Sequence, residues 1–440
     1  MNNTKKELEI LRAAAIPLHD PDLAYDALLE SIGDAQIVML GESTHGTHEF
    51  YDIRAQISQR LIAEQHFNMI AIEGDWPDAY QVNLYIHGQK YTQASTALNS
   101  FDRFPTWMWR NVPMLKMCEW LRSHNKKQEH NDKVGFYGLD MYSLYRSIDE
   151  IINCLDTIDP QLAAEARYNY SCLDHFRADP QTYGYAVFTK ISKPCTDEVI
   201  KQLKILLDRD WDLLAQGALS ADQAFYIEQN ARVVKNAEEY YRQLFVNEIN
   251  NWNLRDSHMF QTINQLIKHY ELKGIKKPKI IIWAHNSHIG NAQATEMNKR
   301  GEYNIGQLIK KQYNKNSFSL GFTTYEGTVS AASDWHGPVE RKFVQKALQD
   351  SYEELFHTVE IPNFLLLLHN KEIVPQTLLE RAIGVIYKPE TERMSHYFYA
   401  HLSQQFDAIM HCDKTTAIEP LEKTAQWIKG ETPETYPSGL

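Results

Sequence analysis

Cysteine is scarce in this sequence, and the few cysteines form no recognisable framework. The 440 residues include five, an odd number without a C-x-x-C pair: Cys118, Cys154, Cys172, Cys195 and Cys412. Small secreted domains and zinc modules depend on paired or closely spaced cysteines. The pattern therefore predicts reduced thiols in the core, with neither a disulfide nor a structural zinc site.

Long hydrophobic runs are also absent. The longest, 364-FLLLL-368 and 280-IIIWA-284, are far shorter than the roughly 20 residues that cross a bilayer. The first twenty residues, MNNTKKELEILRAAAIPLHD, contain no apolar segment of the kind found in a signal peptide. We therefore expect a cytoplasmic protein that is neither exported by a cleaved signal nor embedded in a membrane.

Positive charge is in deficit. Lys and Arg total 45 against 57 Asp and Glu, which gives a formal net charge of −12, and the one basic cluster is the short 273-KGIKKPK-279. Nucleic acid needs a positive surface, so we expect no nucleic-acid partner. A hydrophobic content of 43% is typical of a globular protein, and the length allows two domains or one domain with an insertion.

Several catalytic motifs are missing as well. The sequence has no G-x-S-x-G nucleophile elbow, which argues against a serine hydrolase of the usual kind. It has no G-x-x-x-x-G-K-[ST] or G-x-G-x-x-G loop, so nothing predicts a nucleotide cofactor. The zinc motif H-E-x-x-H is absent too, and we expect no resident cofactor.

What the sequence does contain is a series of short apolar runs bounded by turn residues. Runs that are apolar on both faces indicate buried, mostly parallel strands, and helical patterns separate the first three. The sequence therefore predicts an α/β fold with a mostly parallel central sheet flanked by helices. The expected strands are 36-QIVMLGE-42, 69-MIAIEGD-75, 134-VGFYGLD-140, 280-IIIWAHN-286, 318-FSLGFTT-324, 364-FLLLLHN-370, 382-AIGVIYK-388 and 408-AIMHCD-413.

Residues 145–275 differ from the rest of the chain. They contain no clear strand pattern, several long helical patterns and many aromatic residues. We predict a helical cap inserted into an α/β core formed by residues 1–144 and 276–430, followed by a frayed tail at 431–440. Two interpretations of the cap stay open: an independent helical unit, or a cover over the strand ends that forms an aromatic-lined pocket.

Acids and histidines gather where the predicted strands end. Ligands of open α/β sheets bind beyond the carboxyl ends of the strands, so these residues together predict a functional site. The residues concerned are Glu42 and His45 after the first strand, Glu73 and Asp75 after the second, Asp140 after the third, and His285 and His288 after the fourth.

Arg54 is a candidate cation for this site. It follows the stripe of apolar residues Phe50, Ile57 and Leu61 on the helix that Thr47 is expected to cap. If the first two strands are adjacent, Glu42 and Glu73 repel each other unless a cation lies between them. We expect Arg54 to supply that charge by pairing with one or both glutamates, although its side chain can alternatively extend past the helix edge to solvent.

Histidine occurs twice as H-x-x-H, at His45/His48 and His285/His288. Such pairs can bind a metal ion together with a glutamate. They also suit acid–base chemistry, in which a histidine oriented by a carboxylate takes a proton from water and a second group stabilises the oxyanion. The spacing alone does not decide between the two.

Seven segments resemble the erythromycin esterase family, in the same order and over almost the whole chain: GESTHGTHEFYDIR, AIEGDWPDAYQVNLYIHG, FPTWMWRN, VGFYGLDMYSLYRS, WNLRDSHM, WAHNSHIGN and IGVIYKPETERMSHYF. The resemblance implies an EreA/ChaN-like α/β fold and an esterase that opens a macrolide lactone with water. It implies that His45 is the general base and that Glu42, Arg54, Glu73, His285 and His288 are the other essential positions. Arg255 and Asp256 in WNLRDSHM are interpreted as an ordinary ion pair between or along helices.

The resulting hypothesis is a metal-independent hydrolase of a small-molecule ester, with a macrolide, and hence antibiotic resistance, as one substrate class. One alternative is a hydrolase that uses a metal ion on the H-x-x-H pairs. The other is a non-enzymatic protein that holds haem or another apolar ligand under its cap.

Overall fold

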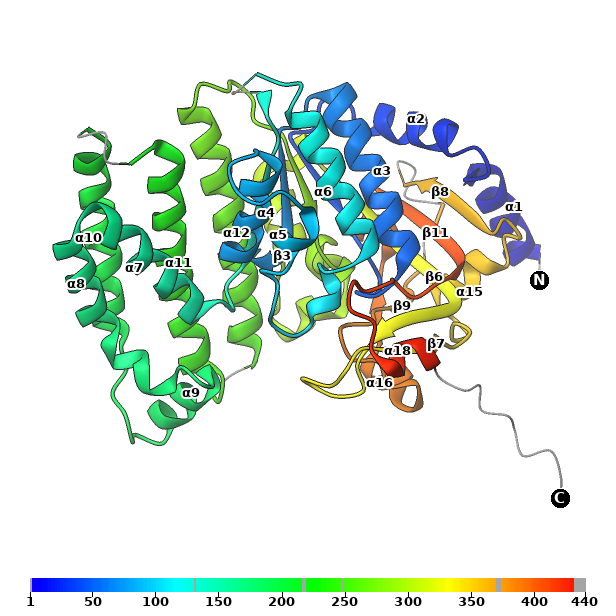
Figure 1. Cartoon of the computed structure of the whole chain (residues 1–440). Coiled ribbons are helices and arrows are strands. Elements are labelled where there is room, and N and C mark those ends of the chain that lie inside the picture. Colours follow the sequence, from blue (N-terminus) through cyan, green and yellow to red (C-terminus); the bar gives the residue numbers. More distant parts are fainter. Residues whose placement is uncertain are drawn as a thin grey trace.

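The computed structural model describes residues 2–129, 132–215, 219–246, 248–368, 373–374 and 376–430. Its centre is a nine-stranded sheet in the order β1-β8-β11-β6-β2-β5-β3-β4, with β7 paired to β6 (Figure 1). The strands are β1 Ile16–Pro17, β2 Ile37–Leu40, β3 Met69–Asp75, β4 Gly135–Asp140, β5 Ile280–Trp283, β6 Ser317–Ala331, β7 Glu340–Val344, β8 Asn363–Leu367 and β11 Ala408–Thr415. A separate two-stranded sheet joins β9 Leu378–Arg381 to β10 Tyr397–Ala400.

Every pairing from β11 through β6, β2, β5 and β3 to β4 is parallel, while β1, β7 and β8 pair antiparallel. The predicted α/β fold with a mostly parallel sheet is confirmed. The predicted strand at 382–388 is wrong: this segment makes only isolated bridges, Ile383 with Thr44 and Ile386 with Ala332. It touches two different segments once each, so no continuous ladder forms.

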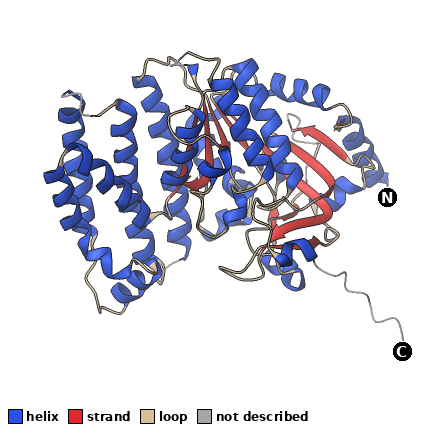
Figure 2. Ribbon diagram, viewed as in Figure 1, coloured by secondary structure: helices blue, strands red, loops and turns tan. Residues whose placement is uncertain are grey.

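Helices cover both faces of the sheet because alternate strand residues are apolar on each side (Figure 2). In β2, Val38 and Leu40 face one core, and Ile37 and Met39 face the other. The first core contains residues of α2 Pro21–Ile32, α3 His48–Gln65, α4 Trp76–Ile86, α5 Ala94–Leu98, α6 Val112–Asn125 and α18 Ala425–Lys429. The second contains residues of α1 Asn2–Ala14, α12 Glu248–Leu272, α13 Asn286–Ile289, α14 Ile305–Tyr313, α15 Tyr352–His357 and α17 Leu402–Gln405. The short α16 Glu392–Ser395 precedes β10.

The helix after the first buried strand begins where the sequence predicts. Helix α3 follows Thr47, whose side chain makes no capping hydrogen bond. Phe50, Ile57 and Leu61 are fully buried on its inner side. The alternative in which Arg54 reaches solvent is wrong, because the Arg54 side chain has 0% exposure.

The helices between β4 and β5 form a bundle beside the sheet, at the left of Figure 1. Five of them share a core of their own: α7 Leu144–Ile158, α8 Pro160–Tyr170, α9 Pro180–Phe188, α10 Thr196–Ala215 and α11 Ala221–Gln243. Helix α12 differs, since Met259, Ile263 and Leu266 pack in the second of the two cores that flank the sheet. The predicted insertion 145–275 thus includes a helix that also covers the sheet. The predicted tail, 431–440, lies outside the described residues.

Two cysteines correct the prediction that all five thiols are free. Cys172 and Cys195 form a disulfide with their Cα atoms 6.1 Å apart, while Cys118, Cys154 and Cys412 are free. They lie 23 positions apart in sequence and meet because the helical bundle folds back on itself. No described helix combines the length and the apolar character that a membrane crossing requires.

Candidate functional site

The carboxyl ends of β2, β5, β3 and β4 lie side by side, in that order. Strand β5 therefore separates β2 from β3, and the expectation that Glu42 and Glu73 extend from adjacent strands is wrong. The polar residues form two charged groups instead of one, with the loop after β5 between them. Sequence order hides this arrangement because β5 comes from a distant part of the chain.

The first group centres on Glu42, which is 1% exposed. One carboxylate oxygen lies 2.9 Å from His45 Nδ1, and the other accepts a 2.7 Å hydrogen bond from Arg54 Nη2. Arg54 also stacks over the rings of Tyr51 and Trp283, with Cζ 4.3 and 4.8 Å from their centroids. Arg54 is therefore the countercharge of Glu42, one of the two glutamates that it was expected to neutralise. The cation beside Glu73 is Arg255.

The second group centres on Glu73, whose cation is Arg255. Arg255 Nη2 donates to Glu73 at 2.7 Å and to Asp140 at 2.6 Å, and its Nε donates to Asp140 at 3.1 Å. Burial opposes ionisation of Glu73, but His288 and Arg255 outweigh it and hold the Glu73 pKa well below its usual value. Buried carboxylates of this kind require paired cations, and α12 supplies this one from the helical segment.

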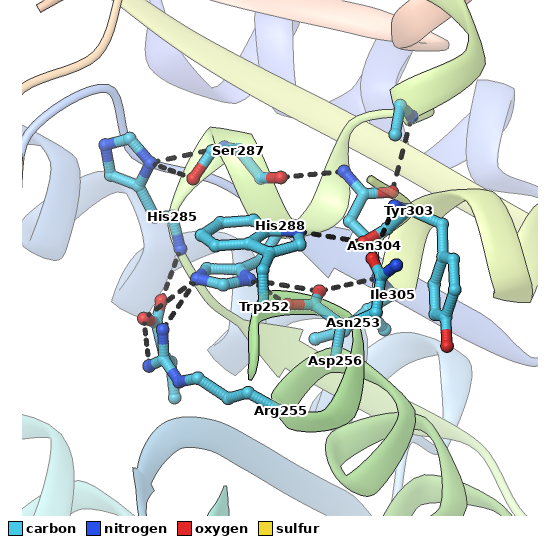
Figure 3. A network of polar contacts seen from close by, with 12 residues as sticks. Trp252, Asn253, Arg255, Asp256, His285, Ser287, His288, Tyr303, Asn304 and Ile305 are labelled. Carbon is cyan, nitrogen blue, oxygen red and sulfur yellow. Dashed lines mark hydrogen bonds and ion pairs between the residues drawn. The ribbon is translucent and has the colours of Figure 1, made fainter. Parts of the chain in front are cut away.

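His288 lies between two carboxylates (Figure 3). Its Nδ1 is 3.0 Å from both oxygens of Asp256, its Nε2 is 3.3 Å from Glu73, and Trp252 stacks on the ring at 4.6 Å. Burial lowers the His288 pKa, but Asp256 and Glu73 outweigh it and raise this pKa to about 9. The two acids therefore favour the protonated ring. Arg255 Nη1 lies 3.0 Å from His288 Nε2, so when the ring is neutral with its proton on Nδ1, Nε2 accepts a hydrogen bond from Arg255.

His285 lies between the two groups and differs from His288 in charge. Its backbone N–H donates to Glu73 at 2.9 Å, and its Nδ1 accepts from the backbone N–H of Ser287 at 3.2 Å (Figure 3). Burial, followed by the nearby His45, lowers the His285 pKa to about 3, so the ring is neutral. With Nδ1 as the acceptor, Nε2 carries the proton. This buried nitrogen makes no hydrogen bond of full geometry, and the backbone of Ser43 is close enough to the ring to oppose the lowering of its pKa.

The rings of His45 and His285 are neighbours, with centroids 4.9 Å apart and planes inclined by 49°. Since Glu42 binds His45 at Nδ1, the His45 nitrogen left for chemistry is Nε2. The structure thus places a histidine oriented by a carboxylate beside a neutral histidine with a free N–H. One can accept a proton while the other donates a hydrogen bond.

His48 does not join this cluster. It is the half-buried first residue of α3, and its backbone N–H donates to Thr416. Across the described ranges, no three His, Cys, Asp or Glu side chains are grouped as a metal site would require. Of the predicted residues, the structure brings together His45, Glu42, Arg54, Glu73, Asp140, His285 and His288. Asp75 instead pairs with Arg103.

Sequence reasoning missed two of the closest partners, Arg255 and Asp256, which it took for an ordinary ion pair. They do not pair simply with each other: Arg255 binds Glu73 and Asp140, and Asp256 binds His288 and the backbone of Ile305. The available signal was their place in WNLRDSHM, one of the segments that carry the family resemblance. A cavity between α10, α11 and α12 is lined by polar residues, and His258 is its one ring-bearing side chain. It lies among the helices, so the predicted alternative of an aromatic-lined pocket over the strand ends stays a prediction.

Comparison with known proteins places this sequence in a family. The family model described as Erythromycin esterase matches residues 62–415, which include Glu73, His285 and His288. The chain belongs to the erythromycin esterase family. The resemblance noted from the sequence is thereby confirmed.

Relatives within and around this family share the fold at low sequence identity. Erythromycin esterase type II from Escherichia coli is 21% identical over 438 residues, with 91% of this chain and 96% of that protein covered. The crystal structure of a succinoglycan biosynthesis protein matches with a TM-score of 0.76 at 22% identity, over 95% of this chain and 99% of the other. A mutant of the erythromycin esterase EreC in its open conformation matches with a TM-score of 0.63 at 18% identity, over 91% and 95%.

Proposed function

We propose that this member of the erythromycin esterase family hydrolyses a carboxylic ester with a water molecule that His45 activates. The observation that carries the proposal is the pairing of the two histidines. Glu42 holds His45 by Nδ1, and the free Nε2–H of His285 lies beside the His45 ring. A general base next to a preorganised donor is what acyl transfer to water needs.

In this mechanism, His45 Nε2 takes a proton from water while the water oxygen bonds to the ester carbonyl carbon. The carbonyl oxygen becomes an oxyanion and accepts a hydrogen bond from His285 Nε2. The intermediate then collapses, the bond to the alkoxy oxygen breaks, and the protonated His45 returns its proton to the leaving alcohol. Glu42 stabilises the imidazolium, and Arg54 balances the charge of Glu42.

Ser287 is the competing nucleophile, since its hydroxyl lies 2.8 Å from His285 Nδ1. Two observations argue against it. The low pKa of His285, caused first by burial, makes this histidine a poor base. Its Nδ1 also already accepts from the Ser287 backbone. Ser43 is no better placed, because its buried hydroxyl has no hydrogen-bond partner and therefore no base.

The family name and the Escherichia coli relative make a macrolide lactone the first substrate class to test. Purified protein is incubated with macrolides of two ring sizes and with simple aryl esters, and products are followed by mass spectrometry. The proposal expects a product heavier by one water, lost in His45→Ala and retained in His48→Ala, the matched control outside the cluster. Retention in Ser287→Ala is also expected.

Full turnover by His45→Ala would overturn the assignment of the base. An acyl-enzyme on Ser287 in the intact mass spectrum would replace the water mechanism with a covalent one. Turnover of aryl esters without any macrolide would keep the mechanism and discard the macrolide. Stoichiometric metal in an active preparation, together with loss of activity on its removal, would favour the metal-dependent alternative instead.

A further inference from the structure

A polar cavity of about 180 Å³ lies between α10, α11 and α12, in the helical part of the molecule. At roughly 30 Å³ for each water, it has room for about six water molecules. Two cations line it, Arg232 and Lys235, together with four carboxamide side chains, His258, a threonine and a leucine. No carboxylate belongs to the lining, although the chain as a whole carries a net charge of −12.

One lining residue, Gln229, has a buried hydrogen-bond donor without an acceptor. Gln229 is 2% exposed, and its Nε2 has no hydrogen-bond partner. Buried donors left unpaired are costly and rare in folded proteins, and a rotation of the Gln229 side chain toward the cavity would let an acceptor there satisfy this one. This observation is independent of the two cations and concerns the same cavity.

The two cations are available to such an acceptor. Arg232 and Lys235 contact Glu228 and Glu239 one turn away on the same helix, at 2.6 and 3.0 Å. All four side chains are partly exposed, and pairs of this type hold their partners weakly. An anion in the cavity would meet both cations at once, whereas each glutamate meets only one of them.

We propose that this cavity binds a small oxyanion, a phosphate or a carboxylate, through Arg232, Lys235 and Gln229. The cavity adjoins the site described above without being part of it. His258 accepts a hydrogen bond from Asn236 at 2.7 Å on the cavity side, and its ring also meets the backbone of Asp140. Asp140 in turn holds Arg255, so one histidine connects the two places.

The test uses the full-length protein with inorganic phosphate and, separately, acetate as probes, each titrated against NaCl of equal ionic strength. Thermal shift and calorimetry report binding. We expect a saturable effect of at least one probe, weakened about tenfold or more in Arg232→Gln and in Lys235→Gln because each loses a charged donor. Lys201→Gln is the matched control: it removes a cation from the exposed side of α10, outside the cavity.

The two probes distinguish the source of the oxyanion, since binding of only one identifies the class. The proposal is overturned if neither probe acts beyond equal ionic strength. It is equally overturned if both cavity variants bind as the wild type does, or if Lys201→Gln weakens binding as much as they do. Arg232 and Lys235 are both partly exposed, so if one variant fails to fold, the other still decides the question.

Discussion

Asp256 and His288 face each other across 3.0 Å, with both carboxylate oxygens equidistant from His288 Nδ1. The carboxylate comes from α12 and the imidazole from α13, just after β5, so the contact joins the helical segment to the sheet. Because Glu73 lies on the other side of the ring, the histidine is buried between two acids that favour its protonated form. The charge of the site therefore depends on a helix that covers the sheet from outside.

The first prediction concerns stability at alkaline pH. Burial alone would lower the His288 pKa, but the two acids Asp256 and Glu73 outweigh burial and raise this pKa from an ordinary 6.5 to about 9. A raised pKa contributes stability that is complete below about pH 6.5 and is lost as the pH rises through 9. Urea unfolding across this range should show that loss. Asp256→Asn should move the loss toward neutral pH, and an identical profile in wild type and variant would contradict the assignment.

The second prediction concerns acidic pH, where His285 should lower the stability of the folded protein. Burial, followed by His45, lowers its pKa to about 3, so below pH 6.5 the unfolded chain binds a proton that the folded chain refuses. Stability from this residue is complete above 6.5 and declines as the pH falls toward 3. Two-dimensional NMR of labelled histidine should show one neutral ring with its proton on Nε2 at neutral pH. A ring protonated on both nitrogens there would refute this tautomer.

Loss of the His285 donor should affect turnover more than binding. Removing one oxyanion donor typically lowers kcat by about 10²–10³-fold. His285→Ala is expected to do so on a confirmed substrate with little change in KM, and His285→Gln to retain part of the rate through its amide N–H. A rise in KM alone would assign His285 to substrate binding instead.

Arg54 should be required for stability, not only for activity. Arg54→Met leaves Glu42 as a buried charge without a partner, and breaking such a pair typically costs about 3–5 kcal/mol. The double variant Glu42→Gln with Arg54→Met should recover much of that loss. Arg60→Met on the same helix is the control, since its partners Asp26 and Glu64 are 65% and 48% exposed and its effect should stay below about 1 kcal/mol. Equal losses in the two arginine variants would show that burial is not the cause.

The Cys172–Cys195 disulfide should stabilise the helical bundle without serving the site. Replacing both cysteines with serine is expected to lower the free energy of unfolding by about 2–4 kcal/mol. The rate of ester hydrolysis should not change. Thiol titration of the unfolded, unreduced protein should find the three free cysteines, and Cys154→Ser should change little. Five reactive thiols would restore the prediction made from the sequence.

The sequence was informative about features that depend only on the residues of one segment. Buried strands such as 69–75 and 135–140 are readable because their residues are apolar on both faces, and the polar residues that end them identify the edge of the site. Arg54 was placed correctly in the interior because its helical phase follows that of Phe50 and Ile57.

What the sequence could not supply was the order of the strands. Glu42 and Glu73 were paired in the prediction because their strands are consecutive, but β5 enters between them from more than 200 residues further along the chain. For a related reason, Asp256 and Arg255 were interpreted from the sequence as an ordinary ion pair and not as part of the site. An acid next to a base on a helix has the same local pattern whether it faces water or a buried glutamate.

Helix α12 follows the helical bundle in sequence but packs against the sheet, and this bears on how the protein can be engineered. A graft that exchanged residues 145–275 between two family members would exchange Arg255 and Asp256 with them, and so replace the cations and acids that hold Glu73 and His288 in place. In chimeras meant to alter selectivity, the exchanged segment should therefore end before Glu248. The recipient then keeps its own α12 and the ion pairs that α12 makes with the sheet, while α7 to α11 are exchanged.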